Sequence, residues 1–437
     1  MKTTTEQAQL TVEPLITALD GVGFGDFTRW LKRRTRCSAS QRVRGSHVHD
    51  DVQLALEIIR WVRKQLEMNG ESPPKRQLIE ALRPLTDDTP DQHSFPLLGQ
   101  ATQLRYGENP HQDAVFRPFL RGGGQPTLQE VAVNGDRSRP SNMSFNNYVD
   151  ADSALELCRE LTRAKLSKCV SAIVKHTNPC GCAITDDEVA AFSKAYLGDP
   201  HAALGGILAV SFPVTEEIAN TVMNSLQLMG KGAGANGFFI EVWIAPRFDD
   251  RAVKTIRTAK RWGERVRLIE ARPPHNEEPR EKRDYKIITD GLLIRTRDLE
   301  GLSESAWSVV TSKRPNDKQI RDLRLAWLIC KHTKSNAVSI CKDGMLIGNG
   351  AGQMSRVMSC RIAAWLAKEN AHEEKLHGAA AASDGFFPFR DGPDVLADAG
   401  VSAIIQPGGS KRDQKVIDAC NERGLAMIFT DTRHFKH

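Results

Sequence analysis

The chain has 437 residues, of which 40% are hydrophobic and 26% charged, proportions typical of globular proteins and not of disordered or fibrous ones. It contains no run of about 18 apolar residues, and its first residues lack the apolar core of a signal peptide, so we expect a cytoplasmic protein without a membrane span. The nine cysteines form no disulfide framework, and the net charge of +6 suits small anionic substrates without indicating nucleic acid.

Residues 1–100 are expected to form a separate, mostly helical segment, and the sequence does not indicate its role. Apolar residues at helical spacing predict a helix over residues 51–68, and a shorter helix follows at 75–82. The polar, proline-containing stretch 87–99 is expected to be a linker. Basic residues gather between positions 29 and 44, and a solvated surface explains them better than a nucleic-acid site, because no aromatic-interleaved RNA-binding module accompanies them.

After residue 104 the predicted strands alternate with helices, which indicates an α/β protein with two domains, at residues 101–285 and 286–437. The first domain is expected to contain a helix at 151–164, strands at 169–174, 203–210 and 238–244, and a charged surface connector at 247–285. The second is expected to contain a hairpin of strands 337–341 and 345–347, a helix at 355–368, and strands 401–405 and 426–429 around a helix at 411–423. The tripeptide Lys-His-Thr occurs at 175–177 and at 331–333, which would fit a duplicated domain.

Polar residues gather where several of these strands end. In Lys175-His176, an imidazole can accept a proton near neutral pH and a neighbouring ammonium can stabilise an oxyanion, although such pairs also occur on ordinary surfaces. Arg105 beside Tyr106 can hold an anion and stack a ring, but a structural turn explains the same residues. The C-terminal residues 432–437 follow a predicted strand directly, which leaves docking of this tail open.

Two further loops have a composition suited to ligands. The glycine-rich stretch 348–352 is expected to let the backbone approach a ligand before the next helix, but it is neither a P-loop nor a dinucleotide fingerprint, so it predicts neither ATP nor NAD. Residues 383–392 combine three phenylalanines with Asp384, Arg390 and Asp391. Stacking of a flat heteroaromatic ligand, held at its polar edge by an aspartate, explains this mixture better than core packing alone.

Taken together, these loops resemble the AICAR transformylase family, the formyl-transfer half of the bifunctional purine biosynthesis protein that also carries IMP cyclohydrolase. The similarity runs from about residue 104 to the end of the sequence. It is carried by RYGENPHQ (105–112), SFNNYVDAD (144–152), VKHTNPCG (174–181), DPHAALGGILAVS (199–211), KSNAV (334–338), IGNGAGQMSRV (347–357), SDGFFPFRDG (383–392), AIIQPGGSKRD (403–413) and TDTRHFKH (430–437).

The resemblance implies a reaction and a fold. Formyl would pass from 10-formyltetrahydrofolate to the 5-amino group of AICAR, giving FAICAR and tetrahydrofolate, with Lys175 stabilising the oxyanion and His176 accepting the proton. The implied fold is a pair of cytidine-deaminase-like three-layer α/β/α domains without catalytic zinc. The implied assembly is a homodimer with shared active sites, with no membrane or nucleic-acid partner, and some members of the family hold a structural potassium ion.

The resemblance also assigns binding residues. The AICAR contacts would be Arg105, Tyr106, Asn147, Gly205, Glu241, Asn336, Phe386 and Arg433, with Arg105 and Arg433 at the phosphate and ribose end. The folate side would be lined by Arg356, Val357, Asp391, Ser410 and Lys411, with Asp391 pairing with the pterin edge.

The sequence departs from the family pattern in two places. The cyclohydrolase domain does not fit into residues 1–100, and none of its pattern occurs there, so we expect no cyclohydrolase activity from this chain. The family segment that usually reads SAFGG is Ala202-Ala203-Leu204-Gly205-Gly206, which lacks a hydroxyl and an aromatic ring on the folate side.

Two other functional classes fit parts of the sequence. Cys180 and Cys182 could suggest a zinc-dependent nucleoside deaminase, but the spacing differs from the Pro-Cys-x-x-Cys pair of such sites and the His-x-Glu partner is absent, so no zinc is expected. A catalytically inert basic binding module is the non-enzymatic alternative, and the intact Lys175-His176 pair argues against it.

Overall fold

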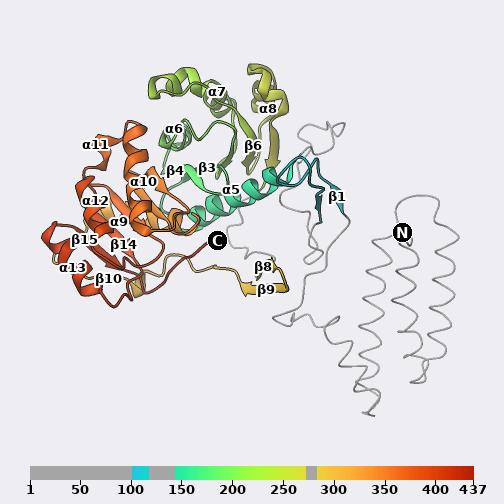
Figure 1. The fold of residues 1–437 in the computed structure, drawn as a ribbon. Helices are drawn as coiled ribbons and strands as arrows, with labels where there is room; N and C mark the ends of the chain where they lie inside the picture. The colour runs from blue at the N-terminus through green and yellow to red at the C-terminus, as the bar shows by residue number, and fades with distance from the viewer. Residues whose placement is uncertain (1–100, 118–142, 272–282) are drawn as a thin grey trace, which may run out of the picture. The chain divides into compact units, whose positions relative to one another are not determined.

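A computed structural model describes residues 101–117, 143–271 and 283–437, shown as the coloured ribbon in Figure 1. The predicted helices 51–68 and 75–82 and the linker 87–99 lie outside these residues. Apart from Ala101 and Arg117, the described residues belong to one compact unit. No helix within them is long and apolar enough to cross a membrane.

An eleven-stranded mixed sheet runs through this unit, with the strand order β10-β15-β14-β13-β11-β12-β4-β3-β5-β6-β7. The strands from the first half of the unit are β3 (Cys169–Val174), β4 (Pro179–Thr185), β5 (Gly206–Val210), β6 (Ile240–Ala245) and β7 (Arg267–Glu270). The second half supplies β10 (Ser308–Val309), β11 (Val338–Lys342), β12 (Met345–Gly350), β13 (Ala380–Ser383), β14 (Ala403–Gln406) and β15 (Ala426–Phe429). The predicted α/β class is therefore confirmed.

The two halves repeat one topology. In each, a hairpin is followed by a strand antiparallel to its first strand and then by two parallel strands, giving β3-β4, β5, β6 and β7 in one half and β11-β12, β13, β14 and β15 in the other. The helices correspond as well: α5 (Phe145–Arg163), α6 (Glu188–Gly198), α7 (Glu216–Ser225) and α8 (Asp250–Ala259) match α9 (Asp317–Lys331), α10 (Arg356–Glu369), α12 (Asp391–Asp398) and α13 (Asp413–Glu422), with a short α11 (Glu373–Leu376) added. The Lys-His-Thr echo is not part of this repeat, because Lys175 follows β3 whereas Lys331 ends α9.

Helices cover both faces of the sheet in three layers. In β3, Val170, Ala172 and Val174 pack into a core shared with α5 and α9, whereas Ile173 faces the core of α6, α7 and α8. A third core lies under α10, α12 and α13. Figure 1 shows α6, α7 and α8 on one side of the first half and α5 on the other.

Three expectations about elements are wrong. The strand predicted at 203–210 begins only at Gly206, and the loop predicted after residue 174 becomes strand β4 at Pro179. Residues 247–271 are not a surface connector, because they form α8 and the edge strand β7. Helix α8 buries only Ala252, Val253 and Ile256, so its charged outer face conceals the helical pattern.

Glycines of β12 serve close packing between a helix and the sheet, and not the approach of a ligand as expected from the sequence. A Cβ atom at Gly348 would lie 2.0 Å from the carbonyl oxygen of Ala363 in α10, and one at Gly350 would lie 1.9 Å from that of Ser359. In the first half, Gly181 of β4 meets the carbonyl oxygen of Ala195 in α6 at the same 2.0 Å. Both hairpins therefore need glycine where their covering helix crosses.

Replacing Gly348 by alanine should lower the free energy of unfolding by at least about 2 kcal/mol, because backbone and not a flexible side chain fills the space that the methyl group needs. The measurement is a denaturant titration of wild type and variant. Gly301→Ala is the control, since nothing lies within 4 Å of a Cβ there and its backbone needs no left-handed conformation. Equal midpoints for all three proteins would contradict the packing argument.

Candidate active site

Strand directions bring most of the predicted site residues to one edge of the sheet. Because β5 is antiparallel to β3, the start of β5 lies beside the end of β3, where Ile207 pairs with Val174. In the second half, Val338 at the start of β11 pairs with Gly350 and Ser383, the last residues of β12 and β13. The chain segments that open on this edge are the turn 175–178, residues 204–205, the start of β6, residues 334–337, and the loops after β12, β13, β14 and β15.

Lys175 and His176 form the tight turn of the β3-β4 hairpin. The backbone N–H of Lys175 donates to the carbonyl of Asn178 at 3.0 Å, and Thr177 adopts a φ of 58°, in the left-handed region. The N–H of Thr177 donates to Asp150 Oδ1 at 2.6 Å, so a carboxylate of helix α5 holds the turn. The side chain of His176 is left 81% exposed.

The side chains of Lys175 and His176 each lie near a polar group outside the turn. Lys175 Nζ donates to the carbonyl oxygen of Leu204 at 2.5 Å, and His176 Nδ1 lies 3.8 Å from Asp150 Oδ2. Burial raises the pKa of Asp150, while the hydrogen bond from Thr177 and the charges of His176 and Lys175 act in the opposite direction. An acceptor such as Asp150 on the Nδ1 side of the imidazole can keep the ring oriented with Nε2 toward solvent.

Asp150 holds the candidate turn and was missed by sequence reasoning. The signal was its place in α5, three residues after the buried Asn147 and four before the buried Ala154, because a carboxylate on the buried face of a helix requires a polar partner.

The two halves of the sheet meet at this turn. The N–H of Lys334 donates to Asn178 Oδ1 at 2.9 Å, and Asn349 Nδ2 donates to the carbonyl oxygen of Pro179 at 2.8 Å. Both contacts join residues more than 150 positions apart in the chain, so no local sequence pattern could have indicated them.

A buried ion pair organises the second half of the edge. Arg356 pairs with Asp384, and its guanidinium also donates to Ser383 Oγ and to Asn336 Oδ1, each at 2.7 Å. Asp384 has no exposed surface and also accepts from the hydroxyl of Ser335. Arg356, expected from the sequence to line the folate side, is only 8% exposed, and both of its terminal nitrogens donate within this network.

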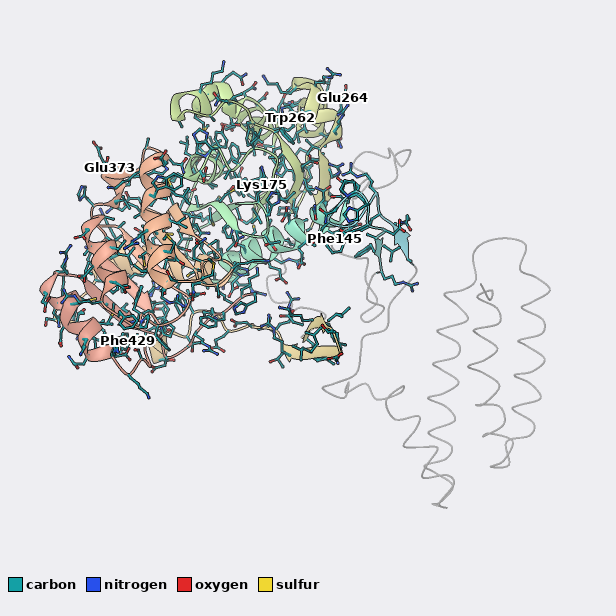
Figure 2. The ribbon with its side chains drawn as sticks, viewed as in Figure 1. Phe145, Lys175, Trp262, Glu264, Glu373 and Phe429 are labelled. Carbon is teal, nitrogen blue, oxygen red and sulfur yellow. The ribbon has the colours of Figure 1, made fainter. Side chains whose placement is uncertain are left out.

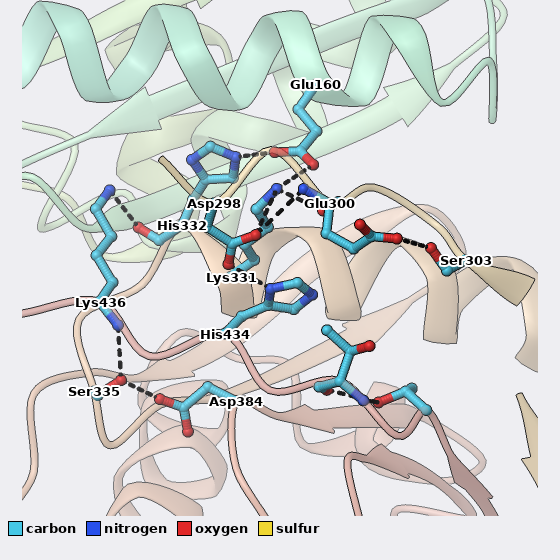
Figure 3. A network of polar contacts seen from close by, with 12 residues as sticks. Glu160, Asp298, Glu300, Ser303, Lys331, His332, Ser335, Asp384, His434 and Lys436 are labelled. Atoms are coloured by element: carbon cyan, nitrogen blue, oxygen red, sulfur yellow. Dashed lines mark hydrogen bonds and ion pairs between the residues drawn. The ribbon is translucent and has the colours of Figure 1, made fainter. Parts of the chain in front are cut away.

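A second ionic network fixes the C-terminal tail, as Figure 3 shows. Glu160 Oε1 in α5 accepts a hydrogen bond from Lys331 Nζ at 2.7 Å, and Glu160 Oε2 lies 2.5 Å from His332 Nε2. Burial would raise the pKa of Glu160, but His332 and Lys331 outweigh it and lower this pKa to about 2. His434 in the tail lies with Nδ1 2.6 Å from Asp298 Oδ2. The second Lys-His-Thr is structural, because Lys331 and His332 are buried and bonded to Glu160.

The remaining second-half residues lie along the same edge. Phe386 and Phe389 are 40% and 50% exposed, whereas Phe387 is buried, and the guanidinium of Arg433 lies 4.6 Å from the ring centre of Phe435. The predicted folate residues occupy the starts of helices and a loop: Val357 in the first turn of α10, Asp391 at the start of α12, and Ser410 and Lys411 after β14.

The first-half residues cluster near the turn. Asn147 forms a capping box with Ser144 at the start of α5, the end of that helix near Asp150. Arg105 lies 5.5 Å from the ring centre of Tyr106, and their loop is joined to α5 by a hydrogen bond from Asn146 to Glu108. Gly205 has a φ of 74°, which favours glycine, and Glu241 pairs with Arg267 at 2.5 Å.

Within one chain, the Lys175-His176 turn and the Phe386 loop lie at the same edge of the sheet but apart from each other. Strands β12 and β11 lie between the β3-β4 hairpin and β13, which puts the backbone of the turn and of the Phe386 loop roughly 14–19 Å apart at about 4.8 Å per strand. Figure 2 likewise shows Lys175 and Phe429, the last residue of β15, in different regions.

No group of three or more histidine, cysteine or acidic side chains in the described residues is placed to hold a metal ion. Burial raises the pKa of Cys180 to about 12 and that of Cys182 well above its usual range. A hollow of about 840 Å³ runs along α7 from Thr215 to Leu228 and contains none of the site residues, so we base the site on side-chain chemistry and not on this hollow.

Replacing Arg356 by methionine should lower the free energy of unfolding by about 3–5 kcal/mol, because Asp384 would remain buried without its cation. The matched control is Arg390→Met, which removes exposed pairs with Asp394 and Glu422 and should leave the unfolding midpoint close to that of wild type. Denaturant titration of both variants is the measurement, and equal losses would contradict the structural role of the Arg356–Asp384 pair.

Comparison with known proteins places these motifs in a family. The model of the AICARFT/IMPCHase bienzyme family matches residues 76–366, beginning upstream of the first motif and inside the segment 1–100. The bifunctional purine biosynthesis protein PurH of Magnetococcus marinus is 42% identical over 340 residues, which are 76% of this chain and 59% of that protein. PurH of Polynucleobacter asymbioticus is 40% identical over 335 residues, which are 77% of this chain and 59% of that protein.

The chain thus spans about three fifths of the length of the curated relatives it matches. The matched region contains the Lys175-His176 turn, Asp150, Asn336 and Arg356. The chain belongs to the AICARFT/IMPCHase bienzyme family.

Proposed function

We propose that this chain transfers a formyl group from 10-formyltetrahydrofolate to the 5-amino group of AICAR, giving FAICAR and tetrahydrofolate in purine biosynthesis. The observation that supports this most is the turn of Lys175 and His176, held by Asp150 at an edge where the other family motifs also lie. Membership of the AICARFT/IMPCHase bienzyme family supports the same reaction.

The chemistry requires the groups that this turn supplies. The amine of AICAR is conjugated with its imidazole ring and is a poor nucleophile, so it must lose a proton as it attacks the formyl carbon. His176 takes that proton, while Lys175, which has two N–H donors besides the one used by Leu204, stabilises the oxyanion. The bond from the formyl carbon to N10 of the folate then breaks, and N10 leaves with a proton that balances the one removed.

We assign the two substrates to the two sets of residues that the motifs indicate. AICAR is held by Arg105, Tyr106, Asn147, Gly205, Glu241, Asn336, Phe386 and Arg433, and the folate by Val357, Asp391, Ser410 and Lys411. Arg356 supports the folate side by fixing Asp384 and Asn336, since its guanidinium is occupied by them. The structural potassium ion that the resemblance allows has no assigned residues, and no step of the reaction uses it.

A second copy of the chain completes the site in this proposal. His176 is 81% exposed and Phe386 is 40% exposed, whereas transfer to a weak nucleophile is favoured in a site that excludes water. The turn and the Phe386 loop are about three to four strand widths apart within one chain, and in this proposal a two-fold partner brings one copy's turn to the other copy's loop.

An apolar hairpin supports such a partner. Strands β8 (Arg283–Ile288) and β9 (Gly291–Thr296) form a separate two-stranded sheet that stands apart from the main sheet in Figure 1. Ile287 is 85% exposed and Leu293 is 54% exposed. A two-stranded sheet is marginal by itself, so burial of these side chains against a second copy would stabilise it.

The proposal includes three further expectations from the sequence: two cytidine-deaminase-like domains, a cytoplasmic location, and no cyclohydrolase activity in these 437 residues. The repeated α/β halves support the first. The last has a direct test, because IMP should not form when FAICAR is supplied to this chain alone.

His176→Ala should lower kcat by about 10²–10⁴-fold, the usual contribution of a positioned proton acceptor. Lys175→Met should also lower kcat while AICAR binding is largely retained, because the oxyanion exists only during transfer. The measurement is the absorbance change on tetrahydrofolate release with AICAR and 10-formyltetrahydrofolate.

The matched control is Lys194→Met, which removes a partly buried lysine that bonds to the carbonyl of Asp343, far from the turn in sequence, and should leave turnover unchanged. Near wild-type turnover of His176→Ala would remove His176 from its role. An effect of Lys175→Met confined to KM would contradict the oxyanion assignment, and no activity in wild type would refute the proposed function.

A further inference from the structure

The repeated halves differ in the connection that leads from the third helix to the fourth strand, which in the first half ends at the site edge. In the second half, α12 ends at Asp398 and β14 begins at Ala403, so residues 399–402 suffice to join them. The equivalent connection of the first half, between α7 and β6, spans residues 226–239 and contains a π-helical turn and a 3₁₀ turn. The extra residues end beside the start of β6, at the edge that carries Lys175.

This connection, residues 226–239, packs on the segment that binds Lys175. The N–H of Gly205 donates to the carbonyl oxygen of Phe239 at 2.8 Å, and a Cβ at Gly205 would lie 3.1 Å from the ring of Phe239. A Cβ at Gly237 would lie 3.5 Å from the side chain of Leu204. Since the carbonyl of Leu204 accepts Lys175 Nζ, a continuous chain of contacts links the Phe239 ring to the ammonium.

The two adjacent phenylalanines have different surroundings. Phe238 is 7% exposed and packs in the core of the first half, with its ring centre 4.7 Å from that of Tyr196 and 6.1 Å from that of Trp262. Phe239 is half-buried and lies outside that core, and its neighbour Leu204 is 37% exposed. Phe239 and Leu204 thus present apolar surface next to Lys175, where folding alone does not require an aromatic ring.

We infer that Phe239 forms an apolar wall of the pocket for the aminoimidazole ring of AICAR. The inference rests on the proposed function and names a binding residue that the sequence motifs do not contain. The reacting amine is bonded directly to that ring, so the ring must lie close to His176 and Lys175. The pterin ring of the folate is farther from the reacting centre, because a methylene group separates it from N10. The KM for the folate tests whether the aminobenzoyl ring, which N10 carries directly, uses this wall instead. Apolar contact on the face of the ring and polar contacts at its edge are the usual way to hold a planar heteroaromatic group.

The test compares two leucine variants by calorimetric binding of AICAR and by steady-state kinetics. Phe239→Leu should weaken AICAR binding and raise its KM by about 10-fold, with the KM for 10-formyltetrahydrofolate and the melting temperature nearly unchanged. Phe239→Tyr should restore AICAR binding, because the ring face is kept. Phe238→Leu should lower the melting temperature and leave both KM values nearly unchanged.

The outcomes separate this inference from the function on which it rests. AICAR binding to Phe239→Leu within twofold of wild type, or an increase confined to the KM for the folate, would overturn the wall while formyl transfer stands. Failure of the wild-type protein to bind AICAR would overturn both.

Discussion

The antiparallel pairing of β12 with β4 is the constraint on which the site depends. Only Met345 and Ala183 are paired in register, but the N–H of Ile184 donates to the carbonyl of Gly344 at 2.9 Å, and side chains of Asn178 and Asn349 add bonds across the joint. This direction places the starts of β5 and β6 at the same edge as the ends of β13, β14 and β15. A parallel joint would send the second half's loops to the opposite edge, away from the Lys175-His176 turn.

The repeated halves therefore contribute different ends of equivalent strands. The first half offers a hairpin turn and strand starts, and the second half offers the loops after its parallel strands, where α/β proteins usually bind ligands. Buried polar residues hold the loops whose side chains contact substrates in the proposed site. Asp150 bonds to the turn of Lys175 and His176, and the Arg356–Asp384 pair fixes the start of the Phe386 loop. A buried ion pair is weak as a source of stability but effective in fixing a loop, since removing either partner leaves an unpaired charge.

The sequence was most informative where patterns are local. The β-branched run 169–174 is strand β3 to the residue, and the hairpin around Asp343 and Gly344 is confirmed. Strand β4 was missed because Pro179, Gly181 and two cysteines look like a loop, although Gly181 is required by the crossing of α6. Asp150, the Arg356–Asp384 pair and the docking of His434 depend on contacts between distant parts of the chain, which a single sequence does not reveal.

In the proposed enzyme, the turn of one copy works with the tail and the Phe386 loop of another copy. The direct measurement is formyl transfer by a co-expressed mixture of the His176→Ala chain and the Arg433→Met chain, each nearly inactive alone. In a mixed dimer one of the two sites receives both intact residues, so random pairing should recover about a quarter of wild-type activity. Activity no higher than the average of the two separate variants would contradict a shared site.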